Sequence, residues 1–228
     1  MTAVPPTSLV RRSGTHRLIP SRHLPRAESV LSAIAEDAAH LQAIIELDDA
    51  TNDRLLAENR LLPAIGVDEL VFAVPEAEVV NAAFCHAHPL GSRFNGPDRG
   101  AWYAAFELAT SQAEVAFHKS VQLTEIGRYF DSVTYDDYLA DFSANLHDLR
   151  DARAFTACLD PASYLESQTL AERLLTSGSL GIVYPSVRRQ GGTCLACFRP
   201  ALVMNVRRSR TYRFSWEGTP VPRITLER

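Results

Sequence analysis

Three side chains that could carry chemistry follow one another closely in the middle of the chain: an arginine, a tyrosine and a glutamate. Arg93 lies in a segment rich in glycine, asparagine and proline, Tyr103 lies in the apolar run at residues 101–106, and Glu114 lies in a helical pattern. An arginine binds phosphate through its planar fork of donors, and a carboxylate stabilises developing positive charge. The spacing predicts that the three groups converge at one edge of a sheet.

Each of these residues also has a purely structural explanation. Ser111 and Glu114 have the spacing of a capping box, in which the glutamate bonds back to the start of its own helix. Arg93 could be a solvated loop residue, and Tyr103 could belong to the core. The residue types alone leave both explanations open.

Cysteines and histidines occur at spacings that invite a metal or redox interpretation. Cys194 and Cys197 lie in a strand-like run, where residues three apart point to opposite faces and cannot share a metal ion. We therefore expect both to be small buried side chains. Cys85, His86 and His88 lie in a loop without a nearby carboxylate or further histidine, so we expect no metal site there.

Several common nucleotide and hydrolase motifs are missing from the sequence. It contains no phosphate-binding glycine loop, no dinucleotide fingerprint after a strand and no Gly-x-Ser-x-Gly elbow. These absences remove the usual sequence support for phosphoryl transfer, for dinucleotide-binding α/β folds and for the common serine hydrolases.

The composition is that of a globular protein. Of 228 residues, 46% are hydrophobic and 22% are charged, and the formal net charge of −4 argues against a general nucleic-acid binder. Lys119 is the single lysine, so arginine supplies nearly all of the positive charge. No apolar run is long enough to cross a membrane and no export signal is recognisable, which predicts a cytoplasmic protein with free thiols.

The elements that must position the candidate residues mix strands and helices. Helical patterns cover residues 164–177 and 110–127, the latter with Ser111 as its expected N-cap, and a short helix follows Pro75. Strand patterns cover residues 70–74, 101–106, 129–146, 180–184, 193–198, 202–206 and 210–216. Because strands outnumber helices without strict alternation, we predict an α+β fold with a compact mixed or antiparallel sheet and flanking helices.

The beginning of the chain differs from the remainder. The first 24 residues lack periodicity and are expected to form an irregular arm, whereas residues 25–59 repeat apolar side chains at helical intervals. We therefore predict an N-terminal arm with a helical extension over residues 1–62 and a catalytic domain over residues 63–228. The apolar stripe of the extension is expected to pack on that domain or on a second copy in a homo-oligomer.

Four separated segments resemble the motifs of RES-domain proteins, in the family's order. They are Gly-Ser-Arg93-Phe-Asn, Trp-Tyr103-Ala, Ala-Glu114-Val-Ala-Phe-His118 and Gly-Ile-Val-Tyr-Pro-Ser186. The resemblance spans about residues 63–210. It implies a fold related to ADP-ribosyltransferases and a bacterial toxin that consumes NAD⁺ as its substrate, by phosphorolysis, hydrolysis or ADP-ribosylation of a target protein. It also implies a cognate antitoxin of the Xre type whose end blocks the pocket.

The resemblance implies a role for each matched residue. Glu114, Arg93 and Ser186 are expected to be catalytic, with Glu114 stabilising an oxocarbenium-like ribose as in glycoside cleavage. Arg93 would also hold a phosphate, Tyr103 would present a flat face to a ring, and Ser186 would donate to the ribose or a phosphate. His118 lies four residues after Glu114, on the same helix face, and could orient that carboxylate.

One departure from the family's pattern leaves a competing hypothesis. Many members carry an arginine on the first strand of the domain, but the run at residues 70–74 contains none. Arg99, Arg188 or Arg189 could replace it. Together with the long helix predicted at residues 25–59, the missing arginine would also suit a catalytically silent interaction module.

Overall fold

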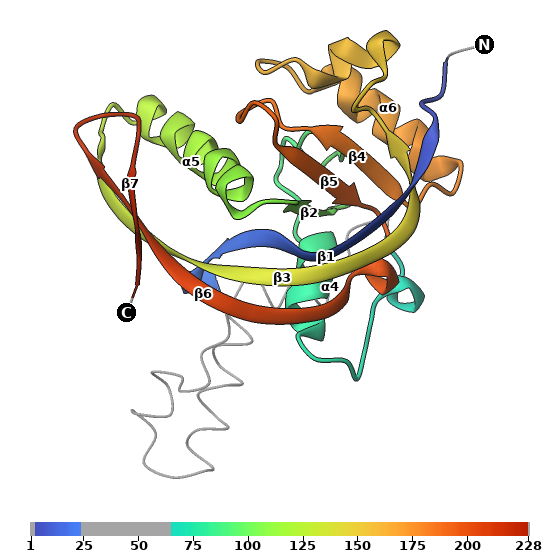
Figure 1. The fold of residues 1–228 in the computed structure, drawn as a ribbon, viewed down its shortest axis with the longest axis horizontal. Helices are drawn as coiled ribbons and strands as arrows, with labels where there is room; N and C mark the ends of the chain where they lie inside the picture. Colours follow the sequence, from blue (N-terminus) through green and yellow to red (C-terminus); the bar gives the residue numbers. More distant parts are fainter. Residues whose placement is uncertain (1–2, 24–64, 228) are drawn as a thin grey trace.

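The computed structural model describes residues 3–23 and 65–227, and its strands build one seven-stranded sheet (Figure 1). The strands are β1 (Thr7–Pro20), β2 (Trp102–Ala105), β3 (Phe130–Asp148), β4 (Gly181–Pro185), β5 (Thr193–Cys197), β6 (Met204–Glu217) and β7 (Arg223–Leu226). The α-helices of the described ranges are α4 (Ala77–Cys85), α5 (Leu108–Glu125) and α6 (Leu165–Thr176). Short 3-10 helices lie at η1 (Ser21–His23), η2 (Val67–Glu69), η3 (Arg153–Leu159) and η4 (Pro200–Leu202).

The sheet is mixed and closes on itself over five of its strands. Its order is β1-β2-β5-β4-β3-β6-β7, and β1 also pairs with β3 along most of its length. The pairings therefore form a closed circuit of β1, β2, β5, β4 and β3, from which β6 and β7 extend. Only β3 and β4 are parallel among these pairs. This architecture confirms the predicted α+β class with a mixed sheet and flanking helices.

Three hydrophobic clusters attach the helices to the sheet. In the first, Leu123 of α5 packs with Phe214 of β6. In the second, Leu174 of α6 packs with Ile182 of β4. The third contains Phe84 of α4. Each fully buried large apolar side chain contributes about 1.5–3 kcal/mol relative to exposure, so these contacts hold α5 and α6 firmly in place beside the central strands.

The two cysteines of β5 point to opposite faces of the sheet, as the strand alternation predicts. Cys194 packs in the cluster that α6 covers, whereas Cys197 packs in the cluster that α4 covers. Both are buried free thiols. The expectation of two small buried side chains is confirmed.

Strand β1 overturns the prediction of an irregular arm at the start of the chain. Residues from Thr7 to Pro20 pair antiparallel with β3, and His16 pairs with Ala105 of β2. The segment has no strong strand pattern of its own, because its conformation is stabilised by hydrogen bonds to a partner far along the chain. It belongs to the same sheet as the predicted catalytic domain. The helix expected at residues 25–59 lies outside the described residues.

One smaller strand prediction was wrong, and two predicted strands proved to be parts of one longer strand. Residues 70–74 form no strand: the backbone of Val71 bonds to the side chain of Asn81, and Ala73 has a φ of 56°. The runs at 202–206 and 210–216 belong largely to the single strand β6, and β7 was not predicted. β7 has four residues and pairs with β6, so its local pattern is too short to be recognised.

Candidate active site

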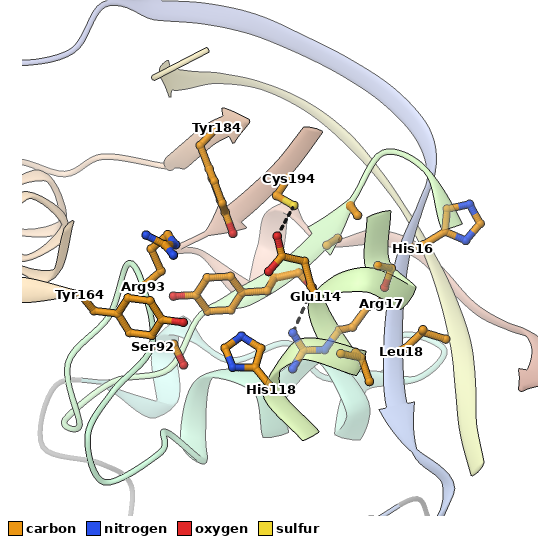
Figure 2. Close-up of a pocket in the computed structure, with 15 residues that line it drawn as sticks. His16, Arg17, Leu18, Ser92, Arg93, Glu114, His118, Tyr164, Tyr184 and Cys194 are labelled. Atoms are coloured by element: carbon orange, nitrogen blue, oxygen red, sulfur yellow. Dashed lines mark hydrogen bonds between the residues drawn. The ribbon is translucent and has the colours of Figure 1, made fainter. Parts of the chain in front are cut away.

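A cavity of about 240 Å³ opens between α5, strand β1 and the loop that precedes β2 (Figure 2). Four of the five predicted site residues line it: Arg93, Tyr103, Glu114 and His118. The other lining residues are His16, Arg17, Leu18, Ser92, Ala104, Ala105, Ser111, Val115, Tyr164, Tyr184 and Cys194. The convergence expected from the spacing of the arginine, tyrosine and glutamate therefore occurs.

Glu114 does not cap its helix. α5 begins at Leu108 with Glu107 in the N-cap position, so Ser111 is not the N-cap and Glu114 lies in the second turn. The capping box inferred from the sequence is therefore absent. The helix begins earlier than expected because β2 ends at Ala105 and the chain turns directly into it. The carboxylate of Glu114 is left to point toward β5.

Ser186, directly after β4, and Cys194 of β5 hold the carboxylate of Glu114 by one oxygen. Ser186 Oγ donates a hydrogen bond to Oε1 at 2.7 Å, and Cys194 Sγ donates to the same oxygen at 3.7 Å. The hydroxyl oxygen of Ser186 accepts from the backbone N–H groups of Arg188 and Arg189, at 3.2 and 3.0 Å, so its proton is directed at Glu114. Ser186 does not line the cavity; it lies against the carboxylate.

Arg93 is a buried residue with a free donor, and it is not a solvated loop side chain. It is 6% exposed, and its Nη1 donates to the carbonyl oxygens of Cys158 at 3.2 Å and Asp160 at 2.8 Å. The ring of Tyr164 lies 4.7 Å from the guanidinium carbon. Its Nη2 is buried and has no partner in the described part of the chain. One side of the fork is therefore fixed while the other side is available.

The loop that carries Arg93 requires a glycine at its start. Gly91 has a φ of 68°, and a Cβ there would lie 2.2 Å from the carbonyl oxygen of Asn95. The loop is fastened from below by Tyr103, whose hydroxyl donates to Asn95 Oδ1 at 2.7 Å and accepts from the N–H of Phe94 at 2.8 Å. Burial raises the pKa of the Tyr103 hydroxyl, which therefore stays protonated as a donor.

Arg17 is the functional candidate that the sequence analysis missed. It lies on β1 and donates from Nη1 to the carbonyl oxygen of Tyr103 at 3.1 Å, and its guanidinium lies 4.8 Å from the centre of the Trp102 ring. Its Nε is buried without a partner among the described residues. Burial lowers the pKa of Arg17 to about 10. The sequence signal for it was weak: an arginine directly before the apolar pair Leu18 and Ile19.

The three arginines suggested as replacements for the arginine absent from residues 70–74 lie outside the cavity. Arg99 forms an ion pair with Glu69, and Arg189 donates to Thr110. Arg188 stacks its guanidinium on the ring of Phe117. None of these three arginines lines the cavity, whereas Arg17 does. The structure therefore brings Arg17 of β1 to the cavity rather than any of the three suggested replacements.

His118 lines the cavity one helical turn after Glu114, as predicted. The structure contains no hydrogen bond between the two side chains within its described ranges, so the suggested orienting contact is not formed. Burial lowers the pKa of His118, although the charge of Glu114 opposes this shift. A neutral imidazole at pH 7 follows, able to donate or accept one hydrogen bond in the cavity.

Residues 3–23 and 65–227 contain no group of three or more histidine, cysteine, aspartate or glutamate side chains that could hold a metal ion. Among the described helices, none has the length and apolar character needed to cross a membrane.

Comparison with known proteins finds a described domain that contains most of the residues lining the cavity. The RES domain model matches residues 69–217 of this chain. An uncharacterized protein of Sinorhizobium fredii, y4oC, is 25% identical over 207 residues, which cover 90% of this chain and 84% of that protein. A chain of the M. tuberculosis MbcT–MbcA toxin–antitoxin complex matches with a TM-score of 0.42 and 16% identity, over 56% of this chain and 73% of that one. The domain match includes Arg93, Glu114 and Ser186, whereas Arg17 lies before it.

Proposed function

We propose that this chain, which belongs to the RES domain family, is a toxin-type enzyme that cleaves NAD⁺ at the bond between nicotinamide and ribose. The observation that carries the proposal is that a buried arginine, Arg93, and a half-buried arginine, Arg17, each have a buried donor without a partner among the described residues and share one cavity with the fixed carboxylate of Glu114. Hydrolysis and phosphorolysis are the two reactions proposed, and transfer of ADP-ribose to a target protein is the alternative. The partner proposed from the family is an Xre-type antitoxin in the cytoplasm.

The two arginines make the cavity suitable for an anion. Arg17 Nε and Arg93 Nη2 are both buried without a partner in the described structure. A buried donor without a partner costs free energy, and a phosphate oxygen would restore the missing hydrogen bond. An anion would also offset the burial that lowers the pKa of Arg17. The pyrophosphate of NAD⁺ supplies charge and acceptor oxygens for both groups.

Glu114 is suited to stabilise the reacting ribose. When the bond from ribose to nicotinamide breaks, its electron pair moves to the positively charged ring nitrogen, and the positive charge passes to the sugar. A carboxylate beside this oxocarbenium-like state stabilises it by about 3 kcal/mol, the effect of one preorganised electrostatic partner. Ser186 and Cys194 hold Oε1. The other oxygen, Oε2, accepts no hydrogen bond from the described residues and is free to face the sugar.

Aromatic side chains form part of the cavity wall, and their faces suit a flat ring. Tyr164 and Tyr184 line it together with Tyr103. Nicotinamide leaves as a neutral molecule, so its departure needs a ring-sized apolar site and no proton donor. The acceptor that then attacks the sugar decides between hydrolysis, phosphorolysis and protein modification, and all three share the same charged state.

The proposal is tested by incubating the purified protein with NAD⁺ and measuring released nicotinamide by chromatography. We expect release, with ADP-ribose as the second product in water and a phosphorylated ADP-ribose if inorganic phosphate is the acceptor. Labelled NAD⁺ with candidate proteins detects transfer to a side chain. A folded protein that releases no nicotinamide with water, phosphate or protein acceptors would support the silent interaction module and overturn the proposal.

Ser186→Ala distinguishes two roles of this hydroxyl: holding the carboxylate of Glu114, and binding the substrate directly. Because Ser186 bonds to Glu114 rather than lining the cavity, we expect the variant to lower kcat about ten-fold and to leave KM for NAD⁺ within about two-fold, the loss expected for one hydrogen bond to a charged group. Steady-state kinetics of nicotinamide release measures both constants. A raised KM with unchanged kcat would instead support direct binding of the substrate by Ser186.

A further inference from the structure

Cys194 has a contact that its burial in the core does not explain. It lies on β5 directly opposite Tyr184 of β4, is 3% exposed, and lines the cavity (Figure 2). Its Sγ lies 3.7 Å from Oε1 of Glu114, on the oxygen that Ser186 also holds. Two adjacent strands therefore deliver two donors to the same carboxylate oxygen.

We propose that Cys194 is a positioning residue, whose protonated thiol fixes one oxygen of Glu114 and thereby leaves the other oxygen facing the substrate. Only one part of the inference rests on the proposed function: the effect of Cys194 on the rate of NAD⁺ cleavage. The contact itself is a property of the resting protein. Ser186 approaches from the end of β4 and Cys194 from β5, so the carboxylate has donors from two directions and one preferred orientation.

The surroundings keep this thiol in its donor form. Burial raises the pKa of Cys194, and the negative charge of Glu114 raises it further. A thiolate in the same position would accept hydrogen bonds and repel the carboxylate, so only the protonated thiol can play this role. A thiol is a weak donor, and we accordingly expect an effect smaller than that of Ser186.

Cys197 is a matched control on the same strand. It is 0% exposed, is a free thiol like Cys194, and lies three residues further along β5 on the opposite face. Its Sγ donates to the carbonyl oxygen of Arg199 at 3.3 Å, away from the cavity. The two cysteines thus share burial and strand but differ in whether they contact Glu114.

The kinetic test compares alanine variants of the two cysteines. We expect Cys194→Ala to lower kcat for nicotinamide release about three- to five-fold at nearly unchanged KM, the size expected for one weak hydrogen bond. Cys197→Ala should lower the melting temperature to a similar degree while kcat per folded molecule stays at the wild-type value. Cys194→Ser, which keeps a donor, should recover part of the loss. Equal kcat values in the two alanine variants would overturn the proposal.

A second measurement does not depend on turnover. The infrared S–H stretching band of Cys194 is isolated as the difference between the wild-type spectrum and that of Cys194→Ala. We expect this band to move to higher frequency in Glu114→Gln, because a neutral amide is a weaker acceptor than a carboxylate. A band that does not move shows that the contact is not formed, whether or not the protein cleaves NAD⁺. If the band moves but the protein does not cleave NAD⁺, the contact between Cys194 and Glu114 is supported and only the proposed function is contradicted.

Discussion

Glu114→Gln should lower the rate of nicotinamide release from NAD⁺ by about 10²–10³-fold, the loss typical of removing one preorganised electrostatic group. Glutamine has the same shape, and it can still accept hydrogen bonds from Ser186 and Cys194 through its amide oxygen. It lacks the negative charge that stabilises the sugar in the transition state. Because Glu114 does not cap α5, the substitution should change the free energy of unfolding by less than about 1 kcal/mol.

Glu107→Gln provides the matched control for this experiment. Glu107 is the N-cap residue of the same helix, and its carboxylate accepts a hydrogen bond from the hydroxyl of Thr110 at 2.7 Å, outside the cavity. We expect this variant to release nicotinamide at the wild-type rate. The rates are compared per folded molecule, with the folded fraction taken from thermal melts of each protein. Turnover in Glu114→Gln within a few-fold of wild type would remove Glu114 from the reaction.

Arg93→Lys should raise the dissociation constant for NAD⁺ by about 10–100-fold, as expected when charge-assisted hydrogen bonds are lost. The guanidinium uses Nη1 to bind the carbonyl oxygens of Cys158 and Asp160 while Nη2 remains free. A lysine ammonium is a single point and cannot bind both the carbonyl oxygens and a phosphate in this geometry. Keeping the positive charge should therefore not keep the affinity.

Arg99→Lys is the corresponding control for a buried arginine. Arg99 is 5% exposed, close to the 6% of Arg93, and it is bonded to Glu69 and to the carbonyl oxygen of Phe198. We expect Arg99→Lys to lower the melting temperature without weakening NAD⁺ binding. Affinity is measured by calorimetry in the Glu114→Gln background, where NAD⁺ is consumed too slowly to change its concentration during the titration. Unaltered affinity in Arg93→Lys would contradict the role of this residue as a phosphate ligand.

Local sequence patterns were sufficient for the helices and for the faces of the short central strands. The apolar periodicity of α4 and α6 lies within each segment, so each helix could be recognised without its neighbours. The same holds for Cys194 and Cys197, whose opposite directions follow from strand alternation alone. The four motifs that resemble RES-domain proteins also lie in continuous segments, and the family they indicate is confirmed by the match over residues 69–217.

Local sequence was not sufficient to predict where α5 begins or which groups surround Glu114. The spacing of Ser111 and Glu114 satisfies a capping box, but the true start of α5 is set where β2 ends and Leu108 begins to pack on the sheet. The donors that fix the carboxylate come from Ser186 and Cys194, more than 70 positions away. No local pattern records such contacts.

Strand β1 shows most clearly what only the tertiary structure decided. Its residues carry little strand signal, and it forms because it pairs with β3, as in the pair of Thr7 with His147. That pairing brings Arg17 to the cavity, whereas the run at residues 70–74 contains no arginine. The sequence by itself determined the family, the fold class and four of the residues that line the site, because these depend on residue type and short spacing. The placement of Arg17 depends on hydrogen bonds between segments more than 100 positions apart, and only folding brings such segments together.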